Sequence, residues 1–378
     1  MRTLAVLAGL VAAVLWAGGR ERLKPVFRWL PLPLWCYVLP IVLVSLGVLP
    51  QGDPAYRLLT ARLLPFALAL LLLGLDLGAV ARTGPKALAC AAAGSAGVIL
   101  GTAGGAALMA GTLPEEAWRG AGALAGTWTG GSMNLVALRA VLDTPDEMFA
   151  PLIIVDTIIA YTWMALLVAG SSRQACLNRW LGAAALPDEP GPPAQESSRP
   201  IGVASTIAAV AIAGTLAWTA GAFGGAMPDT ALISSSTGWA ILAVTTAAIG
   251  LSFLGPIRAL GEPASRVGLP LLYLVLAGLG AQADFAAFRE APGWLGVGAI
   301  ALIVHAACLV GVGRLVRAPI GLIATASQAN IGGFVSAPLV GAVYHRTLAP
   351  AGLLLAIGCN AAGTYAGIIA ASLCRWIS

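Results

Sequence analysis

The chain has 378 residues, of which 59% are hydrophobic and only 10% are charged, and its mean hydropathy is +0.89. Soluble domains carry roughly 25% charged residues, so the composition excludes an ordinary soluble protein. The net charge of +5 suits loops beside anionic lipid and does not indicate nucleic acid. The six cysteines form no C-x-x-C pair, so neither a disulfide framework nor a zinc site is expected.

Apolar runs close to the ~20 residues that cross a bilayer recur along the whole chain. They span residues 3–19, 33–50, 62–79, 86–111, 117–141, 147–170, 202–221, 235–255, 267–283, 292–313, 319–343 and 348–372. Basic residues (Arg20, Arg22, Lys24 and Arg28) follow the first run, which favours a retained anchor over a cleaved signal peptide. We expect an all-α polytopic protein of the plasma (inner) membrane, with about 11–13 transmembrane helices.

A polar segment with five prolines, residues 171–200, separates the two sets of runs and predicts a flexible hydrophilic linker. Residues 1–170 and 201–378 would then be two transmembrane repeats, because residues 61–88 are echoed by residues 265–295. Lys and Arg gather in loops that share one side only if the number of crossings between the halves is odd. We therefore expect inverted repeats, in which either one of the runs at 202–221 and 235–255 does not fully cross or the number of crossings differs from twelve.

Each half carries one glycine-interrupted run at the corresponding place, "LAGTWTGGSMNLVAL" at 124–138 and "IATASQANIGGFVSA" at 323–337. Paired glycines weaken a helix by roughly 1 kcal/mol each, and the backbone groups they free are tolerated in a membrane only against protein or water. We expect one discontinuous helix per repeat, broken at mid-membrane around a small ion or polar solute. The alternative is tight helix packing. The candidate residues are Thr127, Thr129, Gly130, Gly131, Ser132, Asn134, Ser327, Gln328, Asn330, Gly332 and Gly333.

Few ionisable residues lie inside the apolar runs. Asp156 lies well inside one, where a carboxylate costs on the order of 3 kcal/mol unless it is partnered, so it is a functional candidate with a structural hydrogen bond as the alternative. It aligns with Asn360 in the second half, and we expect each of these two residues beside its own glycine pair. Asp76 is close to a helix end, and His305 is predicted to be a packing histidine.

The pattern of "GTWTGGSMN", an Asp in the next helix, "SQANIGG" and a final helix with Asn resembles the membrane family known as domain of unknown function 819. More distantly, residues 64–88 followed by the G-G-S break are similar to sodium/bile acid symporters, in the superfamily of cation/proton antiporters and anion transporters. This resemblance implies crossed broken helices in a core that moves against a scaffold. It implies sodium ligands near Ser132, Asn134, Gln328 and Asn330, to which the repeat alignment adds Asp156. The symporters carry a carboxylate in their second broken helix, which "SQANIGG" lacks.

The leading hypothesis is a secondary active transporter of a small polar solute, coupled to sodium or to a proton, by alternating access. We expect no enzyme, because the sequence offers no H-E-x-x-H, no G-x-S-x-G and no paired intramembrane aspartates. The alternatives are a non-transporting sensor or channel, or an intramembrane enzyme, on the same fold. Expected partners are the solute, the bilayer and, as an option, a second copy in a homodimer. No cofactor is expected beyond Na⁺ as a coupling ion.

Overall fold

The computed structural model describes residues 2–29, 32–184, 202–228, 230, 233, 235–282, 291–345 and 347–377, and every regular element among them is a helix. Helices satisfy all backbone hydrogen bonds within one segment, which the hydrocarbon interior of a membrane demands. Each of the twelve apolar runs overlaps a helix or a pair of helices.

Seven helices in the described ranges are long and apolar enough to cross a membrane. They are Pro54–Leu72, Pro85–Leu108, Asp146–Leu181, Val203–Ala226, Gly261–Gly280, Ala291–Leu315 and Leu348–Ile377. Four shorter apolar helices accompany them, namely Arg2–Gly18, Leu32–Ser45, Ser132–Val141 and Ser236–Ser252. The chain is therefore an all-helical membrane protein.

Two compact units make up the chain, and each draws on both predicted repeats. Unit 1 contains Met1–Leu75, Val136–Thr157 and Ile201–Pro292. Unit 2 contains Asp76–Leu135, Ile158–Pro200 and Gly293–Ser378. Helices α9 (Ser132–Val141) and α10 (Asp146–Gly170) are divided between the two units.

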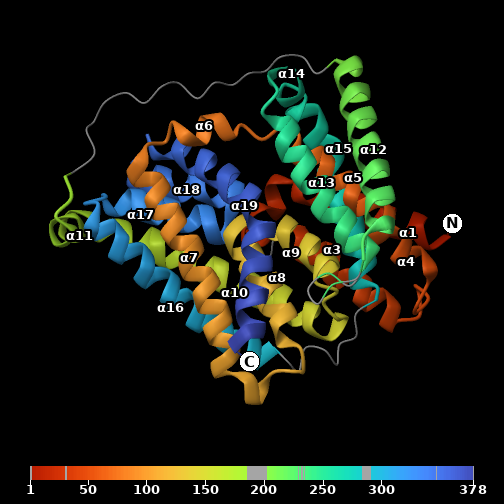
Figure 1. The fold of residues 1–378 in the computed structure, drawn as a ribbon, viewed down its shortest axis with the longest axis horizontal. Coiled ribbons are helices and arrows are strands. Elements are labelled where there is room, and N and C mark those ends of the chain that lie inside the picture. The colour runs from red at the N-terminus through yellow and green to blue at the C-terminus, as the bar shows by residue number, and fades with distance from the viewer. Residues whose placement is uncertain are drawn as a thin grey trace. The chain divides into compact units, whose positions relative to one another are not determined.

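Unit 1 is a bundle in which α15 packs against α1, α3 and α5, while α12 and α13 pack against each other and against α5. Figure 1 shows α5, α12, α13 and α15 lying side by side. Its helices are α1 (Arg2–Gly18), α2 (Lys24–Trp29), α3 (Leu32–Ser45), α4 (Pro54–Leu58), α5 (Leu64–Leu72), α12 (Val203–Ala226), α13 (Ser236–Ser252), α14 (Gly255–Arg258) and α15 (Gly261–Gly280). A Cβ on Gly280 would lie 2.0 Å from the carbonyl oxygen of Tyr37, so α3 and α15 approach backbone to backbone.

Unit 2 is built around its last helix, α19, which packs against α6, α7, α8, α17 and α18. Its helices are α6 (Leu77–Ala81), α7 (Pro85–Leu108), α8 (Ala117–Gly130), α11 (Gln174–Leu181), α16 (Ala291–Leu315), α17 (Ile320–Ile331), α18 (Gly333–Tyr344) and α19 (Leu348–Ile377). Glycines of α7 meet α16 closely: a Cβ on Gly97 would lie 2.7 Å from the Cα of His305, and one on Gly101 would lie 2.6 Å from the Cα of Ala301. Small residues thus allow the close helix packing that is common in membranes.

The predicted linker needs a correction at its start, because Gln174–Leu181 forms helix α11. The Asn178 side chain is buried and accepts a 2.8 Å hydrogen bond from the backbone N–H of Ile320 at the start of α17. A helix N-terminus leaves such N–H groups without an intrahelical partner, so tertiary contact makes this polar segment part of unit 2. Residues 185–200, which the linker prediction also covered, lie outside the described residues.

Candidate functional site

The first glycine pair ends one helix and starts the next. Helix α8 ends at Gly130, α9 begins at Ser132, and Gly131 between them has φ 88° and ψ 173°. Only glycine adopts this backbone conformation without strain. No atom lies within 4 Å of the place where a Cβ of Gly131 would stand.

Gly130 is needed for space rather than for its backbone angles. A Cβ there would lie 2.3 Å from Asn134 Nδ2, 2.8 Å from the carbonyl oxygen of Cys359 and 2.9 Å from the Cα of Asn360. The end of α8 therefore sits directly on the backbone of α19.

The second glycine pair follows the same plan. Helix α17 ends at Ile331, and α18 begins at Gly333. Gly333 has φ 72°, and no atom lies within 4 Å of the place where its Cβ would stand. A Cβ on Gly332 would lie 1.9 Å from Gln328 Nε2 and 2.0 Å from Ser336 Oγ. Those two atoms form a 2.9 Å hydrogen bond that spans the interruption. In each pair the first glycine makes room and the second turns the backbone.

Polar groups of α19 hold the first interruption. Asn360 Nδ2 donates a 2.6 Å hydrogen bond to the carbonyl oxygen of Gly130, and Asn134 Nδ2 donates one of 3.2 Å to the backbone oxygen of Asn360. Thr364 Oγ1 donates to Asn134 Oδ1 at 2.7 Å. Both polar atoms of the Asn134 amide are therefore engaged by α19.

The preceding residue of α19 contacts the second interruption, since Cys359 Sγ lies 3.3 Å from the amide of Asn330. The same amide lies 2.9 Å from Ser95 Oγ on α7. With its oxygen turned toward that hydroxyl, its nitrogen donates to the carbonyls of Ala91 at 3.2 Å and Ala326 at 3.3 Å. The two interruptions are thus joined at neighbouring positions, 359 and 360, of one helix.

This arrangement corrects the expectation that Asn360 lies beside its own glycine pair. Its side chain bonds to Gly130 of the first pair, and its neighbour Cys359 contacts the segment before the second. The repeat alignment compared positions along the chain, but helix packing decides which interruption each position reaches.

Four buried side-chain oxygens of the interrupted helices and of α19 have no hydrogen-bond partner among the described residues. They are Oγ1 of Thr127 and Thr129, Oε1 of Gln328 and Oδ1 of Asn360, and each residue is at most 3% exposed. Among the described residues of unit 2, every unpartnered buried side-chain oxygen belongs to α8, α17 or α19. An unpartnered buried polar group costs roughly 1–3 kcal/mol, so these oxygens are candidates for contact with a ligand.

A polar chain next to this site joins four helices, α7, α10, α16 and α17. The Trp163 indole N–H on α10 donates to Ser327 Oγ at 2.8 Å, and Ser327 Oγ lies 2.8 Å from His305 Nε2. His305 Nδ1 lies 2.9 Å from the carbonyl oxygen of Gly94, which can only accept, so Nδ1 carries a proton and Nε2 accepts from the serine. His305 is fully buried with both ring nitrogens bonded, which agrees with the predicted packing histidine.

A family model described as "Protein of unknown function (DUF819)" matches residues 5–376 of the chain. The chain belongs to the DUF819 family. No curated protein matches it in a sequence comparison.

In this DUF819 protein, twelve of the thirteen candidate residues lie in unit 2. Asp156 is the exception: it is half-buried on the part of α10 that belongs to unit 1. Asp76 has a structural role, because its Oδ1 accepts a 2.9 Å hydrogen bond from the Ala79 N–H and caps α6. Its carboxylate also lies 3.8 Å from the guanidinium of Arg82.

Sequence reasoning missed several residues of the DUF819 site. Ser336 and Thr364 carried a usable signal, since Ser336 follows the second glycine pair by three residues and Thr364 lies one helical turn after Asn360. No sequence signal indicated Ser95 or the contact between Ser327 and His305. Only the packing of α7, α16 and α17 brings Ser95 to Asn330 and Ser327 to His305.

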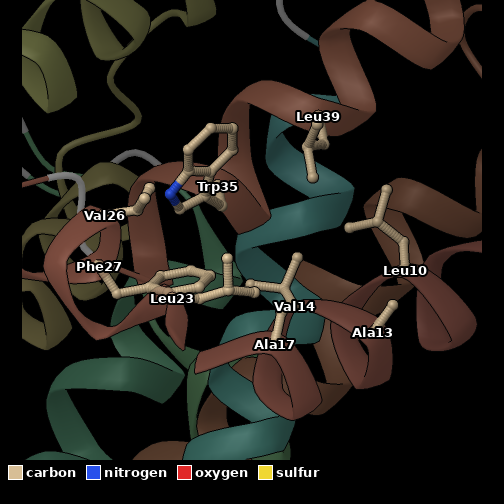
Figure 2. A pocket seen from close by; sticks show the side chains of 9 residues that line it. All are labelled: Leu10, Ala13, Val14, Ala17, Leu23, Val26, Phe27, Trp35 and Leu39. Atoms are coloured by element: carbon tan, nitrogen blue, oxygen red, sulfur yellow. The ribbon is translucent and has the colours of Figure 1, made fainter. Parts of the chain in front are cut away.

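Two cavities of the described chain lie away from these residues. One of about 310 Å³ in unit 2 is lined by residues that include Ala106, Trp118 and Arg375. The other, of about 340 Å³ in unit 1, is apolar and is lined by side chains of α1, α3 and the segment between them (Figure 2). Neither of these two cavities is lined by a candidate residue.

Proposed function

We propose that this protein is a secondary active transporter of a small polar solute in the plasma membrane, coupled to sodium or to a proton. One observation carries the proposal: two glycine-interrupted helix pairs contact positions 359 and 360 of α19, and these helices carry four buried oxygens without a hydrogen-bond partner among the described residues. Interrupted helices of this kind supply backbone and side-chain ligands inside transporters.

The unpartnered oxygens define the chemistry of the ligand. Neutral hydroxyl and amide oxygens of Thr127, Thr129, Gln328 and Asn360 suit a hard cation such as Na⁺, or a solute that donates hydrogen bonds. The amides of Asn134 and Asn330 are already bonded to neighbouring helices, so we assign them the role of holding the interruptions. This shifts the proposed sodium set away from the one implied by the distant resemblance to bile acid symporters.

The two glycine pairs share the same geometry, which supports two inverted repeats with one broken helix each. The two broken helices would cross at mid-membrane. In both glycine pairs a Cβ on the first residue would overlap neighbouring atoms, and the second residue has a positive φ. We propose about 11–13 crossings, with unit 2 as the moving core and unit 1 as the scaffold. Cysteine accessibility at Arg82→Cys and Arg258→Cys tests the inversion: labelling from the same side supports it, and labelling from opposite sides contradicts it.

Sodium binding provides the first test, because it needs no knowledge of the solute. A ligand that binds only the folded state raises the unfolding temperature. We expect the thermal midpoint of the purified protein to rise in sodium chloride relative to choline chloride, and Thr127→Val and Gln328→Leu to remove the rise. A midpoint that responds to pH alone would instead assign the coupling to protons.

Transport itself is tested by solute counterflow in proteoliposomes, after solutes have been screened by thermal shift. Exchange of an unmodified solute supports a carrier. Flux that saturates with neither solute nor ion supports a channel on the same fold.

A second candidate function, an intramembrane hydrolase, is favoured by the contact between Ser327 and His305. The 2.8 Å distance from Oγ to Nε2 is that of a nucleophile and its base. The serine is 1% exposed and already accepts from Trp163, which favours a structural role. A fluorophosphonate probe decides: covalent labelling that Ser327→Ala abolishes supports hydrolysis, and no labelling supports the transporter.

A further inference from the structure

Unit 1 contains an apolar groove between α1 and α3, with a volume of about 340 Å³ (Figure 2). Its wall on α1 runs from Leu10 to Ala17, about 10 Å along the helix axis. Trp35 and Leu39 of α3 form the opposite wall. In Figure 2 the side chains from both helices and from the connecting segment point toward one shared space.

The groove is open to its surroundings. Leu23 and Val26 line it from the connecting segment, yet they are 38% and 44% exposed. Carbon atoms make up the lining except for the indole nitrogen of Trp35. Hydrocarbon of a bilayer lipid matches such a surface, whereas water would find almost no hydrogen-bond partner in it.

Cationic side chains lie where the groove reaches the end of α1. Arg20 and Arg22 are exposed and form no ion pair with a described residue. The Arg20 guanidinium lies 4.0 Å from the ring centre of Trp16, which holds it at the end of the helix. The nearby Glu21 carboxylate is paired with Lys24 at 2.5 Å, so it does not neutralise either arginine.

We propose that this groove binds one anionic phospholipid, with an acyl chain between α1 and α3 and the phosphate at Arg20 and Arg22. The order of the parts matches that of a lipid: an apolar slot about 10 Å deep ends at two exposed arginines, one of them stacked on an exposed tryptophan. Charge complementarity decides between occupants, because a zwitterionic lipid would fill the slot equally well but would gain less from the two arginines.

Native mass spectrometry of the delipidated protein in detergent tests the proposal, with phosphatidylglycerol and phosphatidylcholine as probes. We expect one phosphatidylglycerol to bind more tightly than phosphatidylcholine. Arg20→Gln with Arg22→Gln should weaken phosphatidylglycerol binding by roughly fivefold per arginine and leave phosphatidylcholine binding unchanged. The matched control, Arg57→Gln with Arg62→Gln, removes the same charge from exposed positions outside the groove.

The groove itself is tested by Ala13→Phe, which fills it, against Ala8→Phe on an exposed position of α1 outside it. We expect only Ala13→Phe to weaken both lipids. Equal binding of the two lipids by the wild type, or equal effects of each variant and its control, would overturn the proposal. So would a dimer that Ala13→Phe dissociates, because the occupant would then be a second copy. The arginine variants change exposed side chains only, so they decide the question even if Ala13→Phe does not fold.

Discussion

Asn360 Nδ2 donates a 2.6 Å hydrogen bond to the carbonyl oxygen of Gly130, a residue 230 positions earlier in the chain. Gly130 is the last residue of α8, and the last carbonyls of a helix have no intrahelical partner. The first interruption is therefore stable because a side chain from the second half of the chain completes it. The amide oxygen of Asn360 has no hydrogen-bond partner among the described residues.

Replacing Asn360 by Ala should destabilise the protein by roughly 1–3 kcal/mol, because it leaves the Gly130 carbonyl buried without a donor. Equilibrium unfolding in mixed micelles measures the loss. The control Ser372→Ala removes a hydroxyl from the same helix that bonds only to its own backbone, at the carbonyl of Ile368, and should change little. Equal stability of Asn360→Ala and the wild type would show that the bond carries no net stabilisation.

The backbone angles of Gly131 predict that replacing it by alanine destabilises the protein. Alanine there must adopt φ 88°, which costs roughly 1–3 kcal/mol although nothing obstructs the methyl group. Gly104 lies within α7, one turn before its end, and has equally open space but ordinary helical geometry, so Gly104→Ala should stabilise by roughly 0.5–1 kcal/mol. Thermal unfolding of the two variants should move in opposite directions, and a shared direction would contradict the assigned backbone.

At the second interruption, we expect the stability effects of substitutions at Gly332 and Ser336 to be coupled. Gly332→Ala should force the hydrogen bond between Gln328 and Ser336 open, because the new methyl group would overlap both atoms. Ser336→Ala breaks the same bond directly, so the double variant should lose less stability than the sum of the single variants, by at least roughly 0.5 kcal/mol. A double-mutant cycle by unfolding checks this, and strictly additive losses would refute it.

Asp156→Asn tests whether the one carboxylate deep in α10 carries the coupling. The amide is nearly isosteric, so folding should persist while the sodium or pH dependence of transport disappears. Counterflow at varied sodium and pH measures it. Unchanged ion dependence would leave Asp156 a structural hydrogen-bond partner and assign coupling to the neutral oxygens of unit 2.

The lowered pKa of Asp53, outside the membrane-spanning helices, predicts a pH dependence of the protein's stability. Its carboxylate accepts hydrogen bonds from Thr3 Oγ1 at 2.5 Å and from the Ala55 N–H at 2.9 Å, which lower its pKa below the usual 3.8. A lowered folded-state pKa contributes stability above about pH 4, and that contribution is lost as the pH falls through the folded value. The midpoint of Asp53→Asn should therefore fall less steeply than that of the wild type between pH 6 and pH 3. Parallel curves would show that other groups govern the acid response.

The pattern of apolar residues by itself determined the helical membrane class and the position of the helices. Both follow from local physics, because a bilayer requires long apolar segments whose backbone bonds are internal. The glycine pairs likewise marked the ends of α8 and α17, since a positive φ is a property of one residue and its neighbours.

Only the tertiary structure decided which side chains complete those helix ends. Asn360 reaches the first glycine pair, Asn178 caps α17 from a segment that reads as linker, and His305 meets Ser327. Each contact joins residues on different helices, and no periodicity along one helix encodes its partner. Packing of small residues, such as Gly97 against His305, sets which helices approach closely enough for these bonds to form.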